Sequence, residues 1–292
     1  MIIEEAFFKL PEILLGHTAP HDQYEHTVVN YFAMGVLTEL CARNVASPIS
    51  YITLEKPYVE KFKRIANMRA DMHIDLSGVK IKGLGHELYG IKPENWIEVK
   101  YFGGIGRSKG SEALVSNVGK IAFDLFRLCL FVQEIPTPKR DINARYLLCI
   151  FNAEPSKYLA FKRKDGKIRD WLTQILGAGE QSINILLDNE AKSFKDGFST
   201  KFANNIKTKS ISLQLRTITY PFYPVRTKDE GRPLYWGYLI RIIDFNILID
   251  KYTLSYKDDM GRLSEEFKEL KSRMEKQFQD LLGEIQDERE TE

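Results

Sequence analysis

Apolar and polar residues alternate along two short stretches of this chain, and the alternation predicts two β-strands. In 96–102, three apolar residues alternate with Glu98, Lys100 and Phe102. Because successive side chains of a strand point to opposite faces, we expect Glu98 and Lys100 on the same face. The earlier stretch, 69–76, alternates in the same way and carries Asp71. A third charge on a preceding strand can therefore reach the same patch of sheet.

A helical period marks the segments before and after these two strands. Apolar residues recur every three or four positions in about 22–43 and about 112–132, which predicts two amphipathic helices, the first capped by Asp22. The stretch 145–151 is nearly all apolar, as expected for a central strand covered on both faces. The remaining first-half elements are expected to be an apolar lead-in over 6–15 broken by Pro11, a strand over 49–54 and a short basic helix over 58–67.

The second half of the chain has weaker patterns. They predict helices at 171–176 and 191–202, and strands at 211–220 and 235–249 that form a long hairpin. The last segment, 257–292, has the apolar period of an amphipathic helix, which either pairs with its copy in a homodimer or folds back on the body. Together these elements predict an α/β fold with a central mixed sheet flanked by helices. We expect one domain over 1–256, followed by the C-terminal helix.

The charge of the chain is unevenly distributed. The net charge of the 292 residues is +2, but the segment from Leu263 to Glu292 has 10 acidic and 5 basic residues. That segment has a balance of −5, so the rest of the chain carries +7. A basic body is suited to a polyanionic ligand such as a nucleic acid, although the excess is modest.

The cysteines and the apolar runs favour a cytoplasmic protein. Cys41, Cys129 and Cys149 are isolated in apolar patterns, so we expect buried, reduced thiols. No apolar run is long enough to cross a bilayer, and the N-terminus has no signal-peptide pattern. The chain also has no Walker A or Rossmann glycine motif, so no nucleotide cofactor is expected.

Asp71, Glu98 and Lys100 together have the chemistry that phosphodiester hydrolysis needs. The reaction requires neutralisation of the phosphate charge, an activated water and a stabilised leaving oxygen, all of which Mg²⁺ can supply. Mg²⁺ prefers oxygen ligands and keeps several waters, so one or two carboxylates suffice to bind it. A neighbouring lysine can orient the attacking water, help to deprotonate it, or hold the phosphate as a point charge.

These residues resemble the motif of the PD-(D/E)xK nuclease superfamily. Ala70-Asp71 stands where the family often has Pro-Asp, and Glu98-Val99-Lys100 matches the second half of the motif. The resemblance covers about half of the chain and implies a restriction-endonuclease-like fold. It also implies Mg²⁺, for which Mn²⁺ substitutes, bound by Asp71 and Glu98. A glutamate on the first long helix often joins the metal site in this family, and Glu25 is the candidate here.

Two of these assignments have alternatives. Asp75 lies four residues after Asp71 and points the same way on a regular strand, so it is the other candidate for the first metal ligand. We favour Asp71, because Asp75 is close to Gly78 and can simply end the strand. For Glu25, an exposed acidic residue in a first helical turn, favoured by the helix dipole, is an equally good interpretation.

The expected nucleic-acid contacts lie after the second strand. Arg107 and Lys109 belong to a glycine-rich loop over 103–110, whose alternative role is a solvated turn, and Lys120 lies on the polar side of the following helix. The sequence therefore predicts a Mg²⁺-dependent DNA endonuclease of the restriction or defence type. The alternative is a DNA-binding or assembly protein with the same fold and no catalytic activity.

Overall fold

The computed structural model describes residues 2–16, 24–58, 69–79, 92–103, 111–132, 142–163, 165–186, 211–224, 235–249, 252–255 and 272. None of the helices in these ranges is both long and apolar enough to cross a membrane.

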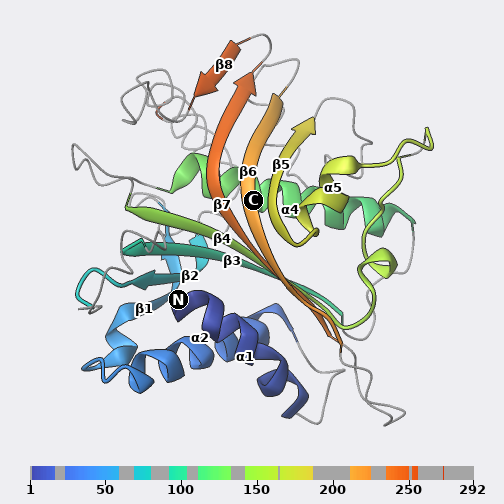
Figure 1. Ribbon diagram of the computed structural model, residues 1–292. Helices are drawn as coiled ribbons and strands as arrows, with labels where there is room; N and C mark the ends of the chain where they lie inside the picture. The colour runs from blue at the N-terminus through green and yellow to red at the C-terminus, as the bar shows by residue number, and fades with distance from the viewer. Residues whose placement is uncertain are drawn as a thin grey trace, which may run out of the picture.

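The described strands form one mixed, mostly antiparallel sheet (Figure 1). Its order is β1-β2-β3-β4-β7-β6-β5, with β8 paired to β7. Only β3 and β4 run parallel among the paired strands of the described ranges. The strands are β1 (Ile52–Pro57), β2 (Arg69–Asp75), β3 (Glu94–Phe102), β4 (Asn143–Phe151), β5 (Gly179–Leu186), β6 (Ile211–Phe222), β7 (Trp236–Ile249) and β8 (Tyr252–Ser255).

Helices cover both faces of this sheet. α1 (Ile2–Gly16) and α2 (Glu25–Ala42) pack on one face, and their apolar side chains share a buried cluster with β2, β3 and β4. α4 (Ser111–Phe131) packs on the other face, where a second cluster runs from β3 to β5 and includes α5 (Asp170–Ile175). In Figure 1, α4 passes behind β5–β7, while α1 and α2 lie below them. The short 3₁₀ helices are η2 (Pro48–Tyr51) and η5 (Pro155–Lys157).

The pairing of β3 with β4 fixes the position of α4. Parallel neighbours need a crossover connection, and α4 lies in the chain between the two strands. All nine residues of β4 are buried, as its apolar sequence predicts for a strand between two helical layers. Glu98 of β3 is level with Leu147 of β4, so the charged face of β3 lies at the centre of the sheet, beneath α4.

A β-bulge interrupts the long pair β6–β7. Arg216 faces Asp244 across the pair, but the next residue, Thr217, faces Ile242, so Ile243 is an extra residue in β7. The extra residue reverses the alternation of β7. Ile242 before the bulge and Phe245 after it therefore both pack in the α4 cluster.

Most of the predicted elements are present. The expected helices at 22–43, 112–132 and 171–176 correspond to α2, α4 and α5, and the expected hairpin strands are the antiparallel pair β6–β7. An α/β fold with a mixed sheet flanked by helices is therefore confirmed. The predicted helices at 58–67, 191–202 and 257–292 lie wholly or almost wholly outside the described residues, as does the capping residue Asp22.

Three details of the predictions were wrong. Pro11 does not break the N-terminal segment but lies inside α1. The expected strand at 49–54 begins at Ile52, because residues 48–51 form a 3₁₀ turn. Cys41 is exposed on α2, whereas Cys129 and Cys149 are buried free thiols as expected. β5 was missed, because its polar positions do not alternate cleanly with apolar ones.

Candidate functional site

Strand β3 projects Glu98 and Lys100 towards α4. Its Ile97, Val99 and Tyr101 pack in the α1–α2 cluster, so the intervening side chains must point to the opposite face. Phe102, on the same face as Glu98 and Lys100, lies in the apolar cluster of α4. The period-2 pattern therefore predicted the shared face of the two charged residues correctly.

Asp71 is fixed to the same part of β3 by a hydrogen bond to its backbone. The ladder between β2 and β3 runs from Met72 to Asp75. At Asp71 the side chain is bonded to β3 instead, where Oδ2 accepts the Val99 N–H at 2.6 Å. This bond holds the Asp71 carboxylate between the positions of Glu98 and Lys100. Of the two aspartates on β2, Asp71 is thus the one that the structure places beside the charged pair.

Asp75 has a different role at the far end of β2. It pairs in register with Glu94, and its Oδ1 accepts the backbone N–H of Ser77 at 2.8 Å. Bonds to Ser77 hold the pKa of Asp75 below its usual value, although partial burial acts against them. His73, on the same strand, is buried against Trp96 and bonds Glu94. Both residues therefore stabilise the strand end and lie away from Glu98.

Lys100 connects two helices through its ammonium group. Its Nζ lies 3.2 Å from Glu25 Oε1 at the start of α2 and 3.1 Å from Asp124 Oδ2 in α4. It also donates to the Val99 carbonyl at 3.0 Å. Burial alone lowers the pKa of this amine, but the carboxylates, Asp124 first, outweigh burial and hold the pKa above its usual value. These carboxylates therefore favour the charged form of Lys100.

Arg127 of α4 supplies a second buried cation. Its Nη2 lies 2.8 Å from Glu98 Oε2 and 2.6 Å from Asp124 Oδ1, one helical turn away. The guanidinium also lies over the ring of Phe123, with 5.1 Å between its central carbon and the ring centroid. Although burial alone lowers the pKa of Arg127, Glu98 and Asp124 hold it above its usual value.

Glu98 is completely buried at the centre of these contacts. Its Oε2 accepts from Arg127, and its Oε1 accepts from the hydroxyl of Tyr58. Burial raises the pKa of Glu98 well above its usual value, the Arg127 charge lowers it, and the charge of Asp71 raises it further. Burial likewise raises the pKa of Asp71 and of Glu25.

The six charged side chains form one group, which we call the ionic cluster. Four carboxyl groups and two cations give a balance of −2 when all are ionised. Burial is the main cause of the raised pKa values of Glu25, Asp71 and Glu98, and neighbouring carboxylates raise them further. An excess negative charge in a buried site is costly, so the site attracts protons or a cation. The members of the ionic cluster are Glu25, Asp71, Glu98, Lys100, Asp124 and Arg127.

The donor chemistry of the ionic cluster fits a divalent cation such as Mg²⁺, since carboxylate oxygens are its preferred protein ligands and a charge of +2 would balance the group. The side chains are not gathered around a single point, however. Within the described ranges, no three acidic, histidine or cysteine residues are placed to hold a metal together. Both oxygens of Glu98 already accept hydrogen bonds, from Tyr58 at Oε1 and from Arg127 at Oε2, so an ion bound to Glu98 has to share these oxygens with the two donors.

The structure thus brings together the predicted Glu25, Asp71, Glu98 and Lys100. Lys120 is exposed on α4, one turn before Asp124, and Arg107 and Lys109 lie outside the described residues. Asp124 and Arg127 were not identified from the sequence. Both are buried, with exposed fractions of 2% and 7%. Their opposite charges at positions i and i+3 are the one sequence signal that points to a pair.

Comparisons with protein-family models, with curated proteins and with solved structures found nothing that matches this chain.

Proposed function

We propose that this protein is a Mg²⁺-dependent endonuclease that hydrolyses DNA phosphodiester bonds. The supporting observation is that Asp71, Glu98, Lys100 and Glu25, from three different elements, share one buried ionic cluster. Of these, Asp71, Glu98 and Glu25 are the proposed metal ligands. Glu25, with 37% of its side chain exposed, is where the cluster opens to solvent.

The order of elements agrees with the proposed restriction-endonuclease-like fold. β2, β3, α4 and β4 follow one another as strand, strand, helix and strand, which is the core arrangement of the PD-(D/E)xK superfamily. β2 and β3 carry the motif residues, and their antiparallel pairing brings Asp71 level with the Glu98–Lys100 pair. This agreement supports the proposal at the level of architecture.

The charges of the cluster assign different roles to its members. When bound, Mg²⁺ would neutralise phosphate charge and lower the pKa of a bound water. Asp124 and Glu25 favour the ammonium form of Lys100, so Lys100 is better suited to donate a hydrogen bond than to remove a proton from water. It is suited to hold a phosphate oxygen or to orient the attacking water as a hydrogen-bond donor. Asp124 and Glu25 position Lys100 through its Nζ.

A matched pair of aspartate variants tests the proposal. We expect the purified protein to cut DNA with Mg²⁺ or Mn²⁺, and Asp71→Asn to reduce the rate by at least about 100-fold, because a proposed metal ligand is lost. Asp75→Asn, on the same strand and outside the cluster, should retain the wild-type rate. Cleavage that survives both Asp71→Asn and Glu98→Gln would show that these residues are not the active site.

One observation favours a second candidate, a DNA-binding or assembly protein without catalytic activity. Arg127 contacts Glu98 and Asp124 and so supplies positive charge where a metal would otherwise be needed. Calorimetric titration with Mn²⁺ discriminates between the two functions. A nuclease should bind the ion and lose binding in Asp71→Asn, whereas the inactive protein should bind DNA with no dependence on metal.

A further inference from the structure

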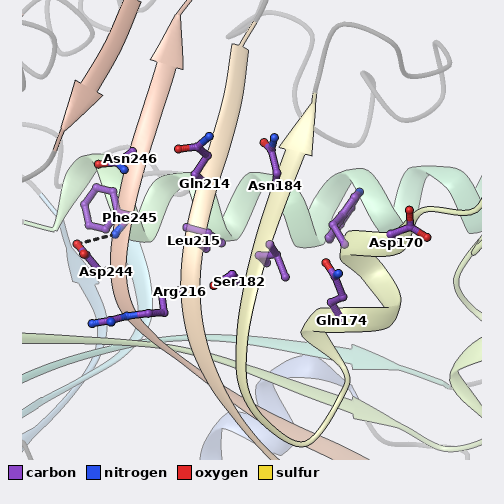
Figure 2. Close-up of a pocket in the computed structure, with 12 residues that line it drawn as sticks. Asp170, Gln174, Ser182, Asn184, Gln214, Leu215, Arg216, Asp244, Phe245 and Asn246 are labelled. Carbon is purple, nitrogen blue, oxygen red and sulfur yellow. Dashed lines mark hydrogen bonds between the residues drawn. The ribbon is translucent and has the colours of Figure 1, made fainter.

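A polar hollow of about 580 Å³ lies on the second half of the sheet, beside α5 (Figure 2). That volume is within the range of about 300–1,000 Å³ typical of small-molecule sites. Its rim carries four side-chain carboxamides, and we call it the carboxamide groove. They are Gln174 of α5, Asn184 of β5, Gln214 of β6 and Asn246 of β7.

Strand register aligns three of these carboxamides in one row. Asn184 pairs with Gln214, and Gln214 pairs with Asn246, so the row crosses β5, β6 and β7 at right angles to the strands. Figure 2 shows the three side chains side by side at the same level. Neighbouring strands lie about 4.8 Å apart, so adjacent carboxamides are close enough to bind one small ligand together.

The four carboxamides of the groove have no side-chain partners among the described residues. No hydrogen bond joins any of the four carboxamides to another described residue. Trp171 of α5, which also lines the groove, is only 5% exposed, and its indole N–H finds no acceptor among the residues described. A buried donor without an acceptor is costly, and a ligand oxygen would satisfy it. This buried N–H distinguishes the groove from an ordinary solvated strand surface.

The charges and rings of the groove restrict the ligand. Asp170 and Asp244 outnumber Arg216, which is itself 3.7 Å from Glu180, so an anionic ligand is disfavoured. Phe245 also lines the groove, but it is 3% exposed and its ring packs in the α4 cluster, against the guanidinium of Arg145. With Trp171 equally buried, neither aromatic side chain offers an open face on which a flat ring could stack.

We propose that the carboxamide groove binds a neutral, polyhydroxylated ligand, a saccharide. Each carboxamide both donates and accepts hydrogen bonds, and each ligand hydroxyl does the same. Ligand oxygens would accept from the Trp171 N–H, and ligand hydroxyls would donate to Asp170 and Asp244. This site is independent of the proposed nuclease activity, because its carboxamides alternate with Leu215 and Phe245 of the α4 cluster and so face away from Glu98.

Side-chain amide NMR of the full-length protein tests the proposal. The probes are five neutral trisaccharides (maltotriose, cellotriose, xylotriose, triacetylchitotriose and galactotriose), with adenosine, glucose and glucose 6-phosphate for comparison. Single variants Asn184→Ala, Gln214→Ala and Asn246→Ala identify the three NH₂ signals. We expect at least one trisaccharide to shift these signals in a saturable manner, and glucose 6-phosphate to bind more weakly than glucose.

Two further variants make the result specific. Trp171→Phe removes the indole N–H together with part of the buried ring system, and should weaken binding about 2- to 10-fold in a variant whose NMR spectrum shows that it is folded. Gln181 lies on β5, the strand of Asn184, but its carboxamide donates to the Ala178 carbonyl outside the groove. Gln181→Ala should therefore leave the affinity for the trisaccharide unchanged. The proposal is overturned if no trisaccharide shifts the signals, if adenosine alone does so, or if the phosphorylated sugar binds more tightly.

Discussion

The ionic cluster and the carboxamide groove lie on opposite faces of one sheet. They differ in whether their polar groups are paired with other groups of the protein. In the cluster, buried charges such as Glu98 and Arg127 satisfy one another. In the groove, carboxamides such as Gln214 bond no described residue and remain available. The comparison shows how one sheet can hold two kinds of site. A buried ionic group is coupled to the stability of the fold, whereas an open neutral group can bind a ligand with little effect on folding.

The largest expected difference concerns stability. Arg127→Met leaves the buried carboxylates of Glu98 and Asp124 without their guanidinium, which should cost about 3–5 kcal/mol of unfolding free energy. Asn246→Ala in the groove should change it by less than about 0.5 kcal/mol. Urea denaturation measures both. The double variant Glu98→Gln with Arg127→Met should lose less than the sum of the single variants, and strict additivity would contradict the coupling inferred from the structure.

The effect of Arg127→Met on metal affinity should be smaller than its effect on the free energy of unfolding. Because Arg127 competes with a cation for Glu98 Oε2, Arg127→Met should bind Mn²⁺ at least about 10-fold more tightly than the wild type, which corresponds to about 1.4 kcal/mol. Calorimetric titration measures the affinity, and Lys157→Met, which removes an exposed cation of η5 outside the ionic cluster, is the control. Equal affinity in the Arg127 variant and the wild type would show that the guanidinium does not compete.

The contributions of the two β2 aspartates, Asp71 and Asp75, to stability should change with pH in opposite directions. The pKa of Asp71 is raised by burial from its ordinary 3.8, so its contribution to stability is present below that pH and is lost as pH rises through the folded-state value. The pKa of Asp75 is lowered, so its contribution is present above 3.8 and is lost as pH falls. Relative to wild type, Asp71→Asn should therefore gain stability as pH rises above 3.8, whereas Asp75→Asn should lose stability as pH rises towards 3.8 from below. Urea denaturation between pH 3 and 7 measures both curves, and the same sign in both would contradict the assignment.

Local patterns predicted the part of the site that lies on single strands. The alternation of β3 was enough to place Glu98 and Lys100 on one face, and Asp71 followed from the preceding strand. The buried residues of α4 were harder to predict. A helix that packs between a sheet and other apolar elements buries more than the one row of apolar residues that its sequence period indicates. Asp124 and Arg127 therefore looked like surface residues, although the carboxylates and Lys100 beneath them make their burial possible.

The groove could not be predicted in the same way. Its row depends on the register of β5, β6 and β7, and these strands are separated in the chain by segments of different length. β5 was not recognised as a strand, so Asn184 had no assigned neighbour. The bulge at Ile243 also reverses the alternation of β7, so a simple period-2 reading of that strand assigns its second half to the wrong face.

The single extra residue at Ile243 has an evolutionary consequence. Deletion of Ile243 would make Ile242 and Asp244 neighbours and turn the pair β6–β7 into a regular ladder, with Asp244 and Asn246 still on the groove face and Phe245 still against α4. Loss of this one residue should therefore be tolerated. Deletion of a single residue elsewhere in β7 would instead turn part of the strand to the opposite face, so it should be far less tolerated than a substitution on the groove surface.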